Sequence, residues 1–275
     1  MCSFGRLRFV ICAILGAVLT LSAARGEDQV DVALVLAVDV SRSMSPDELQ
    51  IQRKGYATAI SSPEVVRAIS MGAHGRIALL MFEWANDNHA RVIVDWSLVE
   101  NQDDAFAFAE KVLGDRTFGQ RRTSISGAIR HATVLLDEVP FLAERLVIDI
   151  SGDGPNNQGL PVTVERDAAV ERGIVINGLP LMTHGGMGFQ FNIPDLDVYY
   201  RHCVTGGPAS FVLPVVEWEQ FPDAVRRKLI LEIGGRTPPE TPRIIPAKIT
   251  FDKPYDCLVG EKIWQRLREQ NFWNQ

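Results

Sequence analysis

An apolar stretch in the first quarter of the chain ends in three oxygen-bearing side chains. Residues 35–45 read VLAVDVSRSMS, so Asp39, Ser41 and Ser43 follow one another at alternate positions. In an extended chain, alternate side chains point to the same side, and the three oxygens can therefore face one point. One carboxylate with two neutral hydroxyls suits a hard divalent cation, because such ions prefer oxygen ligands and keep several waters.

Two further oxygen donors stand in segments that should reach the same place. Thr123 lies in QRRTSISGAI just before a predicted helix, and Asp153 follows the predicted strand LVIDI in the loop SGDG. In an open parallel sheet, ligands bind at the carboxyl ends of the strands. The predicted metal ligands are therefore Asp39, Ser41, Ser43, Thr123 and Asp153.

This donor set favours Mg²⁺, with Mn²⁺ or Ca²⁺ as alternatives. Asp39 and Asp153 together balance the charge of a divalent ion, and the hydroxyls add no charge. An ion held in this way stays electrophilic and keeps a coordination position for an oxygen from outside. The most natural outside ligand is an Asp or Glu carboxylate of a protein partner, so the pattern indicates a binding function.

The segments that must position these ligands alternate between strand and helix patterns. Strands are predicted at residues 30–38, 76–82, 90–96, 144–154, 173–181 and 210–215. Helices are predicted at residues 45–60, 101–113, 124–139, 162–172 and 217–233, with a short one around residues 199–203. This alternation predicts an α/β fold with a mostly parallel sheet covered on both faces.

Two of these helices carry specific expectations. Ser45 and Glu48 predict a capping box at the start of the first helix, with Pro46 at its first position. The helix at 101–113 is expected to bury one apolar face, formed by Phe106, Ala109 and Val112 or Leu113.

The first residues have the pattern of an export signal. Arg6 and Arg8 precede the apolar run FVICAILGAVLTLSAA, and small residues follow up to Gly26. A basic start, a short apolar core and an Ala-x-Ala-like exit predict a secretory signal peptide over residues 1–26, with an uncleaved anchor as the alternative. We therefore expect a secreted or periplasmic protein with no membrane span in its mature chain.

Composition argues against nucleic acid as a partner. The 275 residues are 46% hydrophobic and 23% charged, as in ordinary globular proteins, and the formal net charge is −6. The predicted signal peptide is basic, so the remaining chain is more acidic still. An acidic surface is poorly suited to nucleic acid or to an anionic membrane.

Two cysteines, Cys203 and Cys257, remain after the predicted signal peptide. In an oxidising compartment an even pair can form a disulfide. Two separately buried thiols are the alternative, because sequence alone does not show whether the two Cα atoms come close enough.

Enzymatic patterns near the predicted ligands are incomplete. An aspartyl-phosphate mechanism at Asp39 needs a second Asp two residues further on, where Ser41 stands. A serine hydrolase needs the pattern Gly-x-Ser-x-Gly, but around Ser151 the outer positions are Asp149 and Asp153. The GGMG segment lacks the Gly-Lys-Ser/Thr of a phosphate-binding loop. We therefore expect no enzymatic activity. The alternatives are a metal-dependent hydrolase or phosphatase that activates water, and a purely structural metal site.

The histidines show no metal-ligand spacing, so we expect surface or packing roles for them. One of them falls on a glycine-rich loop that could border the site. The five are His74, His89, His131, His184 and His202, of which His184 is the loop residue.

Together, Asp-x-Ser-x-Ser after the first strand, a Thr before a helix and an Asp in Ser-Gly-Asp-Gly resemble the metal-ion-dependent adhesion site of von Willebrand factor type A domains. The resemblance covers residues 29–233. It implies a doubly wound, mostly parallel sheet with one antiparallel edge strand, which the predicted hairpin from Arg76 to Trp96 matches. It also implies a metal-dependent protein-binding module of the adhesion type. The stretches SGDGPNNQG, YYRHCVTGGPASFV and RRKLILEIGG further resemble an uncharacterised bacterial family of secreted proteins with this domain.

Two features depart from the family pattern. Arg121 and Arg122 precede Thr123 where many relatives have glycines, so the entrance to the site is expected to be more basic and to favour acidic ligands. Residues 234–275 form a Pro-rich arm followed by a short amphipathic helix, and this region lies outside the pattern with no assigned role.

Overall fold

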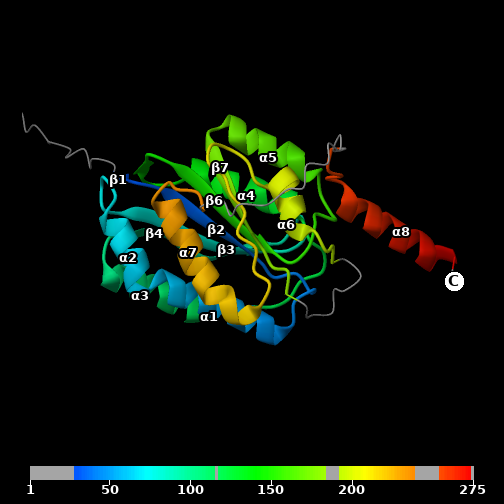
Figure 1. Cartoon of the computed structure of the whole chain (residues 1–275), viewed down its shortest axis with the longest axis horizontal. Coiled ribbons are helices and arrows are strands. Elements are labelled where there is room, and N and C mark those ends of the chain that lie inside the picture. Colours follow the sequence, from blue (N-terminus) through cyan, green and yellow to red (C-terminus); the bar gives the residue numbers. More distant parts are fainter. Residues whose placement is uncertain (1–27, 115–116, 184–191, 239–253, 274–275) are drawn as a thin grey trace, which may run out of the picture.

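A five-stranded sheet forms the centre of the structure (Figure 1). The computed structural model describes residues 28–114, 117–183, 192–238 and 254–273. The strands are β2 (Ala33–Asp39), β3 (Ile77–Trp84), β4 (Ala90–Val99), β6 (Leu146–Gly152) and β7 (Ile174–Pro180). Their order is β4-β3-β2-β6-β7, and all neighbours are parallel except the antiparallel pair β3–β4 at one edge.

Helices cover both faces of the sheet (Figure 1). One face carries α1 (Pro46–Ile60), α2 (Pro63–Ser70), α3 (Gln102–Gly114) and α7 (Phe221–Ile233). The other carries α4 (Ile125–Asp137), α5 (Val162–Glu171), and α6 (Leu196–Tyr199) with its π-helical continuation Tyr200–Val204. Strand β2 is buried along its whole length because it lies at the centre of this doubly wound sheet. The predicted fold class is confirmed.

The junction between β2 and α1 is fixed by local chemistry. The Ser45 hydroxyl accepts a hydrogen bond from the backbone N–H of Glu48 (3.3 Å), and the Glu48 carboxylate accepts one from the backbone N–H of Ser45 (2.7 Å). This is the predicted capping box, and Pro46 occupies the first helical position. The loop between Asp39 and Ser45 is therefore held at both ends, by the sheet and by the helix cap.

The prediction of Phe106 as the buried aromatic residue of α3 is wrong, because the buried aromatic residue lies two positions further on, at Phe108. Phe106 and Leu113 are 51% and 53% exposed, whereas Phe108 and Val112 are buried. The buried residues of α3 are 105, 108, 109 and 112, the i, i+3, i+4, i+7 set of one helical face, and the helix packs against α1 and β4.

Three other elements also differ from expectation. Residues 210–215 contribute only isolated bridges to the edge of the sheet, Gly178–Val212 and Leu181–Val215. Between these bridges, Pro180 at the end of β7 has no N–H to donate. The first predicted strand is divided into β1 (Gln29–Val30), which pairs with β5 (Leu142–Ala143), and β2. Helix α2 was not predicted, although Ser62 caps it and Pro63 begins it.

A buried ionic group ties α7 to the centre of the sheet. Lys228 of α7 is fully buried, and its Nζ lies 2.7 Å from Asp149 Oδ1 on β6 and also contacts Glu232 Oε1. Asn177 on β7 donates a 3.0 Å hydrogen bond to the same Glu232 oxygen. Two carboxylates thus share one lysine, so the group carries an excess of negative charge unless it holds a proton.

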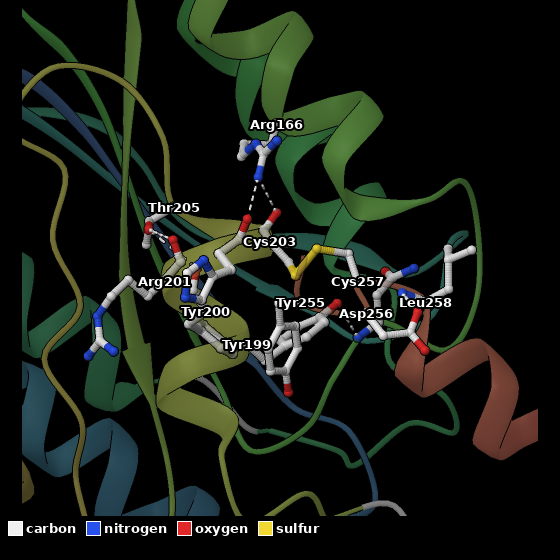
Figure 2. Close-up of a disulfide and its surroundings, with 12 residues drawn as sticks. Arg166, Tyr199, Tyr200, Arg201, Cys203, Thr205, Tyr255, Asp256, Cys257 and Leu258 are labelled. Atoms are coloured by element: carbon white, nitrogen blue, oxygen red, sulfur yellow. Dashed lines mark hydrogen bonds between the residues drawn. A yellow bond between two sulfur atoms is a disulfide. The ribbon is translucent and has the colours of Figure 1, made fainter. Parts of the chain in front are cut away.

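The C-terminal segment ends in helix α8 (Val259–Trp273), which extends away from the sheet (Figure 1). A disulfide joins Cys203, after α6, to Cys257, just before α8, with their Cα atoms 5.5 Å apart (Figure 2). The predicted signal peptide, His184 and most of the Pro-rich arm lie outside the described residues. Within the part of the chain that the structure describes, no helix is long and apolar enough to cross a bilayer.

Candidate metal centre

Asp39 is the last residue of β2, at the carboxyl end of the central strand. Its side chain is buried, and its Oδ1 accepts a 2.7 Å hydrogen bond from the backbone N–H of Ser41. Its Oδ2 is also buried but has no hydrogen-bond partner among the described residues. A buried carboxylate oxygen without a donor is costly, and a cation or a cation-bound water would supply the missing partner.

Side-chain hydrogen bonds link the Asp39 loop to the loop after β6. The hydroxyls of Ser41 and Ser43 lie 2.8 Å apart, and the Ser43 hydroxyl donates a 2.6 Å hydrogen bond to Asp153 Oδ1. The structure thus joins Asp39, Ser41, Ser43 and Asp153 into one cluster at the carboxyl ends of two neighbouring strands.

Thr123 lies on a third segment that is fixed to the other two by backbone contacts. Gln120 exchanges hydrogen bonds with Val40 and Arg42, at 2.9 and 2.7 Å. The Thr123 backbone N–H donates a hydrogen bond to Asn157 Oδ1 (3.0 Å), and the Asn157 backbone N–H donates one to the Thr123 carbonyl (2.9 Å). Among the described residues the Thr123 hydroxyl forms no hydrogen bond with the other predicted ligands. Its coordination of a metal therefore stays a prediction.

Buried polar groups without partners surround Gly152, the residue before Asp153. Asp39 Oδ2, Tyr200 Oη and Trp84 Nε1 all lack hydrogen-bond partners among the described residues. A Cβ atom on Gly152 would lie 2.8 Å from Tyr200 Oη and 2.9 Å from Asp39 Oδ2. Only glycine therefore leaves this space open beside the unpartnered carboxylate oxygen.

The electrostatics of the cluster also suit a cation. Burial raises the pKa of Asp39 well above its usual range, and the nearby charge of Asp153 raises it further. Burial raises the pKa of Asp153 to about 6, and the hydrogen bond from Ser43 opposes that shift. Two enclosed carboxylates repel each other without a positive charge between them. A divalent cation would favour the ionised form of both.

A third carboxylate near the cluster was missed by sequence reasoning. The charge of Glu48 contributes to the raised pKa of Asp153, so this buried residue, which caps α1, lies close enough to act on the site electrostatically. Its Oε2 accepts the Ser45 N–H, and its Oε1 accepts a 2.9 Å hydrogen bond from Trp218 Nε1. Both oxygens already accept hydrogen bonds, which does not favour Glu48 as a general base.

The start of α8 packs against the loops that carry Thr123 and Asp153. The Arg122 guanidinium lies 3.3 Å from the centre of the Trp264 ring, and burial lowers the pKa of Arg122. Glu261 accepts a 2.7 Å hydrogen bond from the Asn156 side chain, and Gly260 packs against the Asn156 backbone. With the disulfide of Figure 2, these contacts hold the C-terminal segment beside the candidate site.

A second group of possible metal ligands lies at the opposite end of the sheet. Asp31, His74 and Glu144 offer ligand atoms within 4.8 Å of one another, and they precede β2, β3 and β6, three neighbouring strands. His74 Nε2 lies 2.9 Å from Glu144 Oε1. Both Asp31 oxygens accept backbone N–H groups, from His74 (3.0 Å) and Arg76 (3.3 Å). Unlike Asp39, Asp31 therefore has protein partners for both oxygens.

A family profile described as "Protein of unknown function (DUF1194)" matches residues 29–237 of the chain. The chain belongs to the DUF1194 family. No curated protein matches the sequence. The fold of this DUF1194 protein is that of von Willebrand factor type A domains, which confirms the family resemblance at the level of structure.

Three solved structures illustrate the likeness, each matched over 75% of this chain. One is a von Willebrand factor type A protein from Catenulispora acidiphila, at 13% identity and a TM-score of 0.51 over 43% of that chain. The second is the proximal thread matrix protein 1 of the mussel byssus "with zinc occupied MIDAS motif", at 12% identity and a TM-score of 0.51 over 48% of that chain. The third is the pilus adhesin SpaC from Lactobacillus rhamnosus GG, at 12% identity and a TM-score of 0.51 over 32% of that chain. The DUF1194 chain spans less than half of each, and identities this low establish the fold alone.

Proposed function

We propose that this DUF1194 protein is a metal-dependent binding protein that captures an acidic group of a protein partner. Asp39, Ser41, Ser43, Thr123 and Asp153 would hold one divalent cation at the carboxyl ends of the strands. The cation, when bound, supplies a Lewis-acidic position for a carboxylate oxygen from outside.

The observation that carries the proposal is the unpartnered Oδ2 of Asp39. This oxygen is buried in a cluster of oxygen donors, where the negative charges of Asp39 and Asp153 repel each other. Oxygen donors with a charge near −2 suit a hard ion, and we propose Mg²⁺ first, then Mn²⁺ or Ca²⁺.

The predicted ligands would have different roles at the metal site. Asp39 and Asp153 would balance the ionic charge, directly or through bound water. The hydroxyls would bind without adding charge, so that the ion keeps its affinity for an outside carboxylate. Two of the similar proteins are consistent with this function: one carries a zinc-occupied site of this type and one is an adhesin. We also propose that the protein works outside the cytoplasm, on the basis of its N-terminal pattern and the Cys203–Cys257 disulfide.

Calorimetric titration of the purified protein with Mg²⁺, Mn²⁺, Ca²⁺ and Zn²⁺ tests the metal site. We expect one site that is lost in Asp39→Ala and retained in Asp31→Asn, the matched change at the opposite end of the sheet. Equal binding by wild type and Asp39→Ala, or loss only in Asp31→Asn, would refute the assignment. Capture of partner proteins with and without EDTA then separates a binding role from a purely structural one. A binding role predicts a partner that is captured with the metal and lost in EDTA, whereas a purely structural ion predicts no such partner.

A further inference from the structure

An open groove of about 700 Å³ lies beside the predicted metal site. It runs between the exposed side of α1 and the segment at residues 117–120, with the end of α3 at its far side. Its volume is in the range of pockets that bind ligands in proteins. Nothing in the proposed metal chemistry uses it.

The groove is continuous with the loop that carries the predicted ligands. Arg42, which lines it, stands between Ser41 and Ser43 in the sequence. Its Nε donates a 3.3 Å hydrogen bond to the Gly119 carbonyl, and its backbone N–H donates a 2.7 Å bond to the Gln120 carbonyl. The groove thus borders this loop on the side of Arg42, and a chain bound to the metal through one carboxylate would reach it by crossing the loop, at about 3.3 Å per residue if extended.

The lining is positively charged although the protein as a whole is acidic. The groove is lined by Arg42, Arg53 and Lys54 and by no acidic residue among those described, whereas the whole chain has a formal charge of −6. Arg53 is buried and paired with Glu83, so it forms part of the floor. Arg42 and Lys54 are exposed and present their charges to the groove.

Two large apolar side chains stand at the other side of the groove. Phe118 is 68% exposed and Leu113 is 53% exposed, and both line it. Exposed large apolar residues beside a cationic wall suit an amphipathic occupant rather than a free anion, because burial of apolar surface is favourable.

We propose that this groove binds the residues that flank the metal-bound acid of the protein partner. The occupant is an extended acidic segment with a second carboxylate opposite Lys54 or Arg42 and a large apolar side chain against Phe118 and Leu113. This inference rests on the proposed function, since the metal fixes one end of the segment.

Selection of random linear peptides by display on the full-length protein in Mg²⁺ tests the proposal. We expect enriched peptides to carry an acid followed within a few residues by a second acid and a large apolar residue. A synthetic peptide of the enriched sequence should bind about tenfold more weakly to Lys54→Glu and to Phe118→Ser. The matched controls are Arg67→Glu, which changes an exposed cation in α2, and Met71→Ser, which changes an exposed apolar residue directly after α2. Both should leave the affinity for the peptide unchanged.

The outcomes distinguish the two proposals. Peptides that need Mg²⁺ and Asp39 but bind Lys54→Glu and Phe118→Ser as tightly as wild type would overturn the groove and leave the metal-binding function standing. Peptides that bind equally in EDTA, or to Asp39→Ala, would overturn both. Metal titration of the two groove variants should match wild type, because neither side chain is a predicted ligand.

Discussion

The hydroxyl of Ser43 donates a 2.6 Å hydrogen bond to Asp153, a residue 110 positions further along the chain. This bond joins the loop after β2 to the loop after β6, so the two carboxylates of the candidate site are held in one cluster before any ion arrives. Preorganisation of this kind reduces the cost of binding.

Replacing Ser43 by alanine should weaken Mg²⁺ binding by about tenfold or more, because it removes a predicted ligand and the donor to Asp153. Ser43→Thr keeps the hydroxyl and should retain most of the affinity. Titration calorimetry measures both, with Ser70→Ala, an exposed serine of α2, as the control. Equal affinities for Ser43→Ala and wild type would show that this hydroxyl does not take part.

Asp39→Asn should change stability and metal binding in opposite directions. Without metal, it removes a buried charge that has no cationic partner, so the melting temperature in EDTA should rise by a few degrees. The further rise that Mg²⁺ gives to the wild type should disappear. Thermal unfolding with and without Mg²⁺ checks both signs, and a variant that is less stable in EDTA yet still responds to Mg²⁺ would contradict the assignment.

Two glycines of the SGDG loop provide a matched pair. A Cβ on Gly152 would clash with Tyr200 Oη and Asp39 Oδ2, whereas a Cβ on Gly154 meets no atom within 4 Å. We expect Gly152→Ala to lower the free energy of unfolding by about 1–3 kcal/mol and to weaken metal binding. Gly154→Ala should do neither. Urea denaturation and metal titration of the two variants test this, and similar behaviour of the pair would rule out the steric argument.

The buried group around Lys228 predicts a pH dependence of stability. Burial raises the pKa of Glu232 to about 7, and the charge of Asp149 adds to the rise while Lys228 opposes it. A carboxyl whose pKa is raised by folding contributes stability below its unfolded value, and this is lost as the pH rises through its folded value. The free energy of unfolding should therefore fall by roughly 1–3 kcal/mol from Glu232 as the pH is raised through about 7.

Glu232→Gln isolates this contribution. The buried Asp39 and Asp153 give a slope of the same sign in metal-free protein, so the difference between variant and wild type is the informative quantity. Chemical denaturation across about pH 5 to 8 should give a flatter profile for the variant. Parallel profiles would show that Glu232 does not change its protonation in this range.

The contacts of α8 predict where its stability comes from. Trp264→Ala removes the cation–π contact with Arg122, worth about 0.5–1 kcal/mol at a partly exposed site. Amide hydrogen exchange in α8 should become faster, while exchange in β2 and β6 stays unchanged. Gln270→Ala, an exposed change on the same helix, is the control. Unchanged exchange in Trp264→Ala would mean that the disulfide and the contacts with Asn156 hold the helix without the Arg122 contact.

Local chemistry explains which features could be predicted from the sequence. The capping box at Ser45 and the end of β2 at Asp39 depend on neighbours within a few residues. Strand–helix alternation then brings Asp39 and Asp153 to the same end of the sheet by topology alone.

Features that depend on long-range packing could not be predicted in this way. Helix α3 has large apolar residues on more than one side, so only its packing against α1 selects Phe108 over Phe106. The Asp31, His74 and Glu144 group could have been found from the sequence. Each of these residues stands just before a strand, and the amino ends of parallel strands lie together at one edge of the sheet. Which oxygen of Asp39 lacks a partner depends on side-chain orientation, which no spacing encodes.

The bond between Cys203 and Cys257 closes a covalent ring that contains α7. Cutting one peptide bond anywhere inside this ring would leave two fragments still joined through sulfur, and their release would need a reductant. On a non-reducing gel a protein nicked once there would therefore migrate as a single species, with α8 still attached to the domain.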